Sequence, residues 1–314
     1  MNHTRLDFIA SAAAAIVVPE AFADEPGPPS LVSAAEDAVL DMWQKETDLA
    51  TPELYGKYLR DGNTRSLASL DKLEAGFEKV LREAKETVVT GDAPAIWSVY
   101  NMGFIVKTRK AMFSIDLVHR RAEEFAPLLD FALITHNHGD HWCRSFYDAM
   151  NGVGKTVISN FLDNYGAADW RKGGSKWHES GGYVRGEKEF RLKDVMIRTS
   201  LIDHNVYLVD FTTAFEIKIG DFLLYHTGDG GRGTEPKLKT VWGCPDLWLM
   251  FPGCRIDVAK AVGKIAPKRL VFGHLWELGH KTGRLTGTAV RHALVKARPL
   301  CGDVSFALWG DRVS

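Results

Sequence analysis

The sequence predicts a layered α/β protein with a helical segment in front of its main domain. Short β-type runs alternate with helical stretches after Gly91, and mixed elements of this kind form layered α/β folds. The chain has 314 residues, of which 45% are hydrophobic and 25% are charged. This length and composition suit one large globular domain with a sizeable core. We therefore expect the function to depend on a pocket in that domain.

Residues 1–23 are predicted to be a cleaved export signal. An apolar run at residues 8–18 follows Arg5, and Ala21-Phe22-Ala23 has the small-x-small pattern of a cleavage site. The run is too short to span a bilayer, which takes about 20 residues. The alternative is a buried N-terminal helix. The signal predicts a periplasmic or secreted protein with no stable membrane insertion, and it leaves the export route open.

Residues 24–90 are predicted to form a linker and a helical segment that packs on the main domain. The linker is Pro26-Gly27-Pro28-Pro29, and Asp61-Gly62-Asn63 predicts a turn within the helical region. Apolar residues at helical spacing predict one buried helix face at residues 70–81. They are Leu70, Leu73, Phe77, Val80 and Leu81.

Residues 91–314 are predicted to form the main domain, in which short strands alternate with helices. The β-type runs cover residues 95–100, 103–107, 111–117, 131–135, 157–159, 195–201, 206–211, 214–219, 222–226, 247–250 and 269–272. Helical patterns cover residues 256–265 and 288–295. This order of elements is the basis of the predicted layered fold.

Charge and cysteine content argue against two classes of protein. The formal net charge is −1, from 39 basic and 40 acidic residues, whereas nucleic-acid-binding proteins carry a clear basic excess. Four cysteines without a CxxC pair are too few for a disulfide scaffold and do not form a zinc ribbon. In an exported protein Cys244 and Cys254 have two alternatives, a disulfide or free buried thiols.

The most informative segment is residues 135–141, which read Thr-His-Asn-His-Gly-Asp-His after an apolar run. Its potential metal ligands are His136, His138, Asp140 and His141. An extended backbone directs His136 and His138 to the same side. A turn at Gly139 then brings Asp140 and His141 towards a second position. Imidazole and carboxylate groups suit zinc, so the segment predicts a metal site in a loop that leaves a buried strand.

This HxHxDH pattern resembles the hallmark of the metallo-β-lactamase superfamily. The resemblance covers roughly residues 95–280 and implies an αββα sandwich with three more ligands at strand ends. These are His204, Asp229 and His274. It implies one metal held by His136, His138 and His204. A second metal is held by Asp140, His141 and His274, with Asp229 bridging the two, and Asp140 is also assigned a catalytic role.

The ligand set implies two divalent metal ions, zinc or alternatively manganese or iron. Two such ions about 3.5–4 Å apart lower the pKa of a shared water and polarise a substrate oxygen. Two divalent cations, two aspartates and one hydroxide leave a net charge of about +1, which favours substrates that carry or develop negative charge.

We therefore expect a hydrolase for a small-molecule ester, lactone or phosphodiester-type substrate, with no nucleic-acid partner. Asp229 at the bridging position resembles lactonase-like and phosphodiesterase-like members more than lactam-hydrolysing enzymes. The alternative is a non-catalytic metal-binding protein of the same fold. The sequence leaves the substrate and the oligomeric state open.

Residues near the motifs have their own expected roles. Asp116, at the end of a predicted strand, is expected to orient a metal-bound imidazole, with a loop or helix-cap carboxylate as the alternative. His226 is expected to pack in its strand, and Cys143 to be a small buried residue. His280 is a candidate for the pocket lining, as are Trp142 and Trp276, whose alternative is a place in the core.

Overall fold

The computed structural model describes residues 31–160, 186–280 and 284–314 of the chain. The predicted export signal and the linker at residues 26–29 lie outside these ranges, so export stays a prediction. Within the described ranges, no helix is long and apolar enough to cross a membrane.

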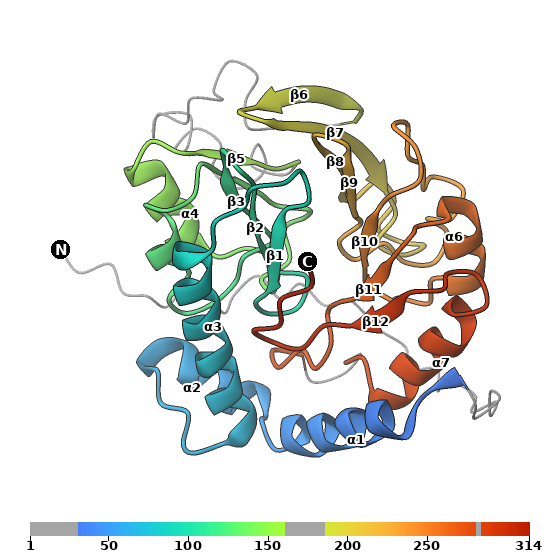
Figure 1. Ribbon diagram of the computed structural model, residues 1–314. Coiled ribbons are helices and arrows are strands. Elements are labelled where there is room, and N and C mark those ends of the chain that lie inside the picture. Colours follow the sequence, from blue (N-terminus) through green and yellow to red (C-terminus); the bar gives the residue numbers. More distant parts are fainter. Residues whose placement is uncertain (1–30, 161–185, 281–283) are drawn as a thin grey trace.

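Two β-sheets face each other, and helices cover their outer sides (Figure 1). The first sheet has the strand order β1-β2-β3-β4-β5. Its strands are β1 (Ala95–Ser98), β2 (Phe104–Lys107), β3 (Met112–Ile115), β4 (Phe131–Leu133) and β5 (Thr156–Ile158). β1, β2 and β3 pair antiparallel, whereas β3, β4 and β5 pair parallel.

The second sheet has the order β12-β11-β10-β9-β8-β7-β6. Its strands are β6 (Lys188–Leu192), β7 (Val195–Ile202), β8 (Thr212–Ile219), β9 (Phe222–His226), β10 (Leu247–Met250), β11 (Leu270–Phe272) and β12 (Val304–Phe306). β6 to β9 pair antiparallel in succession, and β9 to β12 pair parallel. The core strands of both sheets are almost wholly buried, as expected for sheets covered on both faces.

Helices complete the outer layers of the sandwich. They are α1 (Ala34–Asp48), α2 (Pro52–Asp61), α3 (Ala68–Glu86), α4 (Arg144–Gly152), α6 (Val258–Ile265) and α7 (Gly287–Ala297). α3 and α4 lie against the first sheet, and α6 and α7 lie beside the second (Figure 1). The arrangement is the predicted αββα sandwich with an N-terminal helical segment.

The N-terminal helices form as the local sequence signals predict. α1 begins with a capping box, in which Ser33 and Glu36 exchange side-chain to backbone hydrogen bonds. α2 ends at the predicted turn, where Gly62 has a φ of 71°. All five residues of the predicted apolar face of α3 are buried. The ring of Trp43 in α1 packs at a tilt against Trp276 of the main domain, with ring centroids 5.1 Å apart, so this segment packs on the sandwich.

Strand direction gathers the predicted ligands at one edge of the sandwich. β3 and β4 are parallel, so the residues that follow them, from Asp116 and from Thr135, emerge at the same end. In the second sheet β7 runs in the same direction as β9 and β11, since two antiparallel pairings separate β7 from β9. The loops after these three strands carry His204, Asp229 and His274. The topology therefore brings distant parts of the sequence to one place.

The prediction of a strand at residues 206–211 is wrong, because this segment is a loop. The Asn205 side-chain oxygen accepts hydrogen bonds from the backbone N–H groups of Tyr207 and Leu208, which closes a local turn. Asp210 adopts a φ of 51°, outside the strand region. Three of the apolar side chains that gave the β-type pattern, Val206, Tyr207 and Val209, are exposed, with Tyr207 87% accessible.

Burial of His119 makes the fold sensitive to acid. The imidazole lies between helical segments, stacked on Phe77 at 3.9 Å, with Nε2 2.8 Å from the Tyr58 hydroxyl. Because Nδ1 accepts a hydrogen bond from the Arg121 backbone N–H, Nε2 carries the proton of the neutral ring. Nε2 therefore donates a hydrogen bond to the Tyr58 hydroxyl. Burial lowers the pKa of His119 from 6.5 to about 3, so the folded protein holds this imidazole neutral.

We predict that His119→Gln reduces the loss of stability on acidification. Between pH 6.5 and about 3 the unfolded chain protonates this histidine and the folded chain does not, so folding stability falls as the pH falls. The loss from this one group is up to about 1.4 kcal/mol per pH unit. Urea unfolding of wild type and variant at pH 7 and pH 4.5 measures the difference. An identical pH dependence in the two proteins would contradict the assignment.

Candidate metal centre

The seven predicted ligands converge in two groups at the edge where the strand ends meet. One group is His136, His138 and His204, and the other is Asp140, His141, Asp229 and His274. Within each group, one ligand atom of every residue lies within 4.8 Å of the others. The grouping matches the two predicted metal positions, and Asp229, the predicted bridging ligand, lies in the second group.

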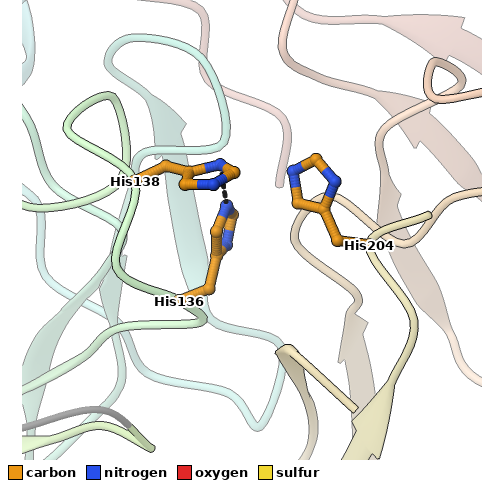
Figure 2. Close-up of side chains that lie close together, drawn as sticks. All are labelled: His136, His138 and His204. Atoms are coloured by element: carbon orange, nitrogen blue, oxygen red, sulfur yellow. Dashed lines mark hydrogen bonds between the residues drawn. The ribbon is translucent and has the colours of Figure 1, made fainter. Parts of the chain in front are cut away.

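The first group consists of three imidazoles from two loops (Figure 2). His136 Nε2 lies 3.1 Å from His138 Nδ1, and the His138 and His204 ring centroids are 4.7 Å apart. Burial lowers the pKa of His136 well below its usual value and that of His138 to about 4. Both imidazoles are therefore neutral at pH 7, which is the form that binds metals.

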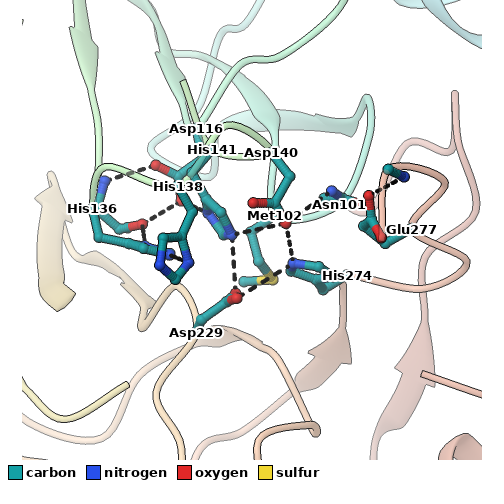
Figure 3. A network of polar contacts seen from close by, with 12 residues as sticks. Asn101, Met102, Asp116, His136, His138, Asp140, His141, Asp229, His274 and Glu277 are labelled. Atoms are coloured by element: carbon teal, nitrogen blue, oxygen red, sulfur yellow. Dashed lines mark hydrogen bonds and ion pairs between the residues drawn. The ribbon is translucent and has the colours of Figure 1, made fainter. Parts of the chain in front are cut away.

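The second group combines two carboxylates with two imidazoles (Figure 3). His274 Nε2 lies 3.0 Å from Asp140 Oδ2, and His141 Nε2 lies 3.2 Å from Asp229 Oδ1. Burial alone would lower the pKa of His274, but Asp229 and Asp140 outweigh it and raise the pKa to about 10. The two carboxylates thus favour positive charge at this position, whether a proton on the imidazoles or a metal ion.

Asp229 lies between the two groups. Its Oδ2 is 3.4 Å from His274 Nε2 in the second group and 3.6 Å from His204 Nε2 in the first. Its other oxygen faces His141. A single carboxylate is therefore within reach of ligands of both candidate metal positions.

Three buried atoms at the centre have no hydrogen-bond partner. They are His141 Nε2, His204 Nε2 and Asp229 Oδ1. The His141 and Asp229 atoms are close, but they are not aligned as a hydrogen bond. An unpaired buried polar atom costs about 1–3 kcal/mol, and imidazole nitrogens with carboxylate oxygens are ligands of zinc and related metals. The residues present therefore fit divalent metal ions.

Asp116 holds the imidazole of His141 in the orientation that ligation needs. Its carboxylate is fully buried and accepts hydrogen bonds from the Thr135 N–H at 2.7 Å and the Thr135 hydroxyl at 2.6 Å. Its Oδ2 also lies 2.8 Å from His141 Nδ1. Since the carboxylate only accepts, Nδ1 donates, and in the neutral imidazole Nε2 then has its lone pair free for a metal ion at the centre. This contact is the one predicted for Asp116.

Other predicted neighbours have mixed outcomes. His226 is engaged in the core, with Nε2 3.0 Å from the Met102 carbonyl, as expected. Trp276 is buried against Trp43 and belongs to the core. His280 lies beside Asp140 with its imidazole more than half exposed, and its Nδ1 is 2.8 Å from Glu277. Trp142 is partly buried and donates a hydrogen bond to the Asn137 carbonyl.

Cys244 and Cys254 are both free thiols, which confirms one of the two alternatives. The expected burial is wrong for Cys244, which is exposed. Cys254 lies with its sulfur 3.9 Å from His204 Nδ1. Cys143 is a buried free thiol at the start of α4, as expected.

The structure adds residues that the sequence analysis missed. The Phe211 ring lies 5.2 Å from the His138 ring, and Phe251 lies 4.4 Å from His274. Asn101 and Glu277 approach Asp140 from the side opposite the first group (Figure 3). None of these residues belongs to a recognisable motif, so no local pattern could have found them.

Comparison with known proteins supports the fold. No family model matches the chain. The chain is 32% identical over 137 residues to a UPF0173 metal-dependent hydrolase of Heliobacterium modesticaldum. The match covers 41% of this chain and 52% of the relative, so the chain spans about half the length of the curated relative it matches.

Two solved structures superpose on most of the chain. A possible metal-dependent hydrolase from Veillonella parvula has a TM-score of 0.51 at 13% identity, over 70% of this chain and 98% of its own. The metallo-β-lactamase fold protein YhfI from Bacillus subtilis also has a TM-score of 0.51, at 14% identity, over 71% of this chain and 100% of its own. The chain has the metallo-β-lactamase fold. This confirms the predicted fold class and the resemblance to that superfamily.

Proposed function

We propose that the protein is a hydrolase with two divalent metal ions, which cleaves a small ester, lactone or phosphodiester-type substrate. The observation that carries this proposal is the position of Asp229 between two ligand groups, where three buried ligand atoms lack hydrogen-bond partners. The similarity to metal-dependent hydrolases supports the reaction class. Zinc is the proposed metal, with manganese or iron as alternatives.

The chain's own residues have distinct proposed roles. His136, His138 and His204 would hold one ion, and Asp140, His141 and His274 the other, with Asp229 shared. When bound, the metal ions would lower the pKa of a water and polarise the substrate oxygen. Asp116 orients His141 through Nδ1. Asp140, proposed as both ligand and catalytic residue, lies on the side of the centre that faces Glu277 and His280.

Charge favours the proposed substrate classes. Two divalent ions outweigh the two carboxylates of the ligand set, so the loaded centre is positive and stabilises negative charge that develops on a substrate oxygen. Esters, lactones and phosphodiesters all develop such charge during hydrolysis. The proposed substrate is a small molecule, since the near-neutral net charge lacks the basic excess typical of nucleic-acid-binding proteins.

An activity screen of the full chain tests this function. The protein is stripped with a chelator, reloaded with zinc, manganese or iron(II), and assayed on an aryl ester, a γ-lactone and bis(p-nitrophenyl) phosphate. Hydrolysis that appears only in the reloaded protein is expected for at least one substrate. A protein that binds metal but leaves all three unchanged would instead favour the alternative, a non-catalytic metal-binding protein.

A further inference from the structure

Asn101 contacts two candidate ligands that come from different sheets. It lies in the turn between β1 and β2 and is 2% exposed. Its side-chain Nδ2 donates to Asp140 Oδ2 at 3.4 Å, and its backbone carbonyl accepts from the His274 N–H at 2.9 Å. Figure 3 shows the side chain beside Asp140. One residue therefore touches two of the three loops that supply the second ligand group.

The conformation of Asn101 indicates that its side chain has a role. Its φ is 52°, in the left-handed region that glycine adopts most easily and asparagine tolerates. Its Oδ1 is buried without a hydrogen-bond partner, which is unfavourable. A strained backbone and an unpaired buried atom at the same residue are typical of functional sites. In this conformation the side chain makes its hydrogen bond to Asp140.

Asp140 and His274 belong to different sheets, so no single strand or helix sets their relative position, and a residue that contacts both can do so. Asp140 follows β4 of the first sheet, and His274 follows β11 of the second. His274 is itself held at a φ of 60°, and its Nε2 is 3.0 Å from the same Asp140 oxygen that Asn101 contacts. The Asn101 backbone thus anchors one ligand while its side chain anchors the other.

We propose that Asn101 is a positioning residue that sets the distance and orientation of Asp140 and His274, and so the affinity of the second metal position. The proposal rests on the proposed function of the centre. Residues that orient metal ligands typically change metal affinity 10–100-fold when they are removed. We expect an effect in that range at the second position, and no effect at the first.

Two variants isolate the side chain from the backbone. Asn101→Gly removes the amide but adopts the left-handed conformation without strain, so the carbonyl that anchors His274 is kept. Asn101→Ala also removes the amide but keeps the Cβ, so agreement between the two variants separates the loss of the side-chain contact from a change in backbone freedom. Lys193→Gly is the matched control, since Lys193 has a φ of 56° in the turn between β6 and β7, outside both ligand groups.

Competition titration with a chromophoric chelator measures both zinc affinities of the metal-free proteins. Both Asn101 variants should lose affinity at one position by about 10–100-fold, while the other position and Lys193→Gly match wild type. Circular dichroism of the metal-free proteins shows that the fold is kept. Two wild-type affinities in both variants would overturn the role of Asn101 alone. A wild-type chain that binds no second ion would refute the binuclear centre, and the role of Asn101 with it.

Discussion

Replacing His136 by alanine should abolish hydrolysis and leave the fold intact. The imidazole is buried between His138, His141 and Thr135, and it contributes one ligand of the first group. We expect the rate to fall by more than about 100-fold, because removing a residue that only orients a ligand already costs about 10–100-fold. His138→Ala should have the same effect, because two imidazoles cannot hold the ion as three do.

Parallel assays and melting curves test this expectation. The rate is measured on whichever substrate the metal-loaded wild type cleaves, and the melting temperature is measured without metal. His292→Ala is the matched control, since His292 lies on α7 and belongs to neither ligand group. Near-wild-type turnover in either His136→Ala or His138→Ala would show that the first group is not part of the catalytic centre.

Replacing Asp229 should lower the metal content from about two ions per chain towards one. Its two oxygens face His141, His204 and His274, so its carboxylate would hold both ions and reduce their mutual repulsion. Asp229→Ala removes the side chain. Asp229→Asn keeps the shape but cannot supply the anionic bridge, and therefore tests the charge alone. Turnover should fall severely in both variants.

Elemental analysis of proteins purified in parallel after saturation with zinc decides this prediction. Asp221→Asn serves as control, because Asp221 is an exposed carboxylate in the turn between β8 and β9. If Asp229 were only a turn carboxylate, both variants would keep two ions and an unchanged rate. That result would refute the bridging role.

Four of the candidate ligands could be predicted from a local signal, because the HxHxDH segment is dense in ligand groups and follows a buried apolar strand. The other three, His204, Asp229 and His274, could be predicted because the resemblance implies ligands at later strand ends, and each of them follows a strand. Strand direction then places these ends at one edge. The apolar face of α3 and the glycine turn after α2 could be predicted for the same reason, since helical spacing and a left-handed cap depend on neighbouring residues.

Features that depend on tertiary contacts could not be predicted. β6 alternates charged and half-buried residues, so its pattern resembles that of a surface loop, and β12 is only three residues long. The apolar residues at 206–211 resemble a strand, but the side chains of Asn205 and Asp203 hold the segment in a loop. The contact of Asn101 with the site could not be predicted either, because it forms only in the folded chain, where the His274 N–H after β11 donates to the Asn101 carbonyl.

The metal content of the wild-type chain tests the central claim most directly. The full protein is saturated with zinc, freed of excess metal by gel filtration, and analysed by inductively coupled plasma mass spectrometry against protein concentration. We predict about two zinc ions per chain, with hydrolysis that is lost on chelation and restored by reloading. A chain that retains no metal, or hydrolysis that chelation leaves unchanged, would contradict a binuclear metal hydrolase.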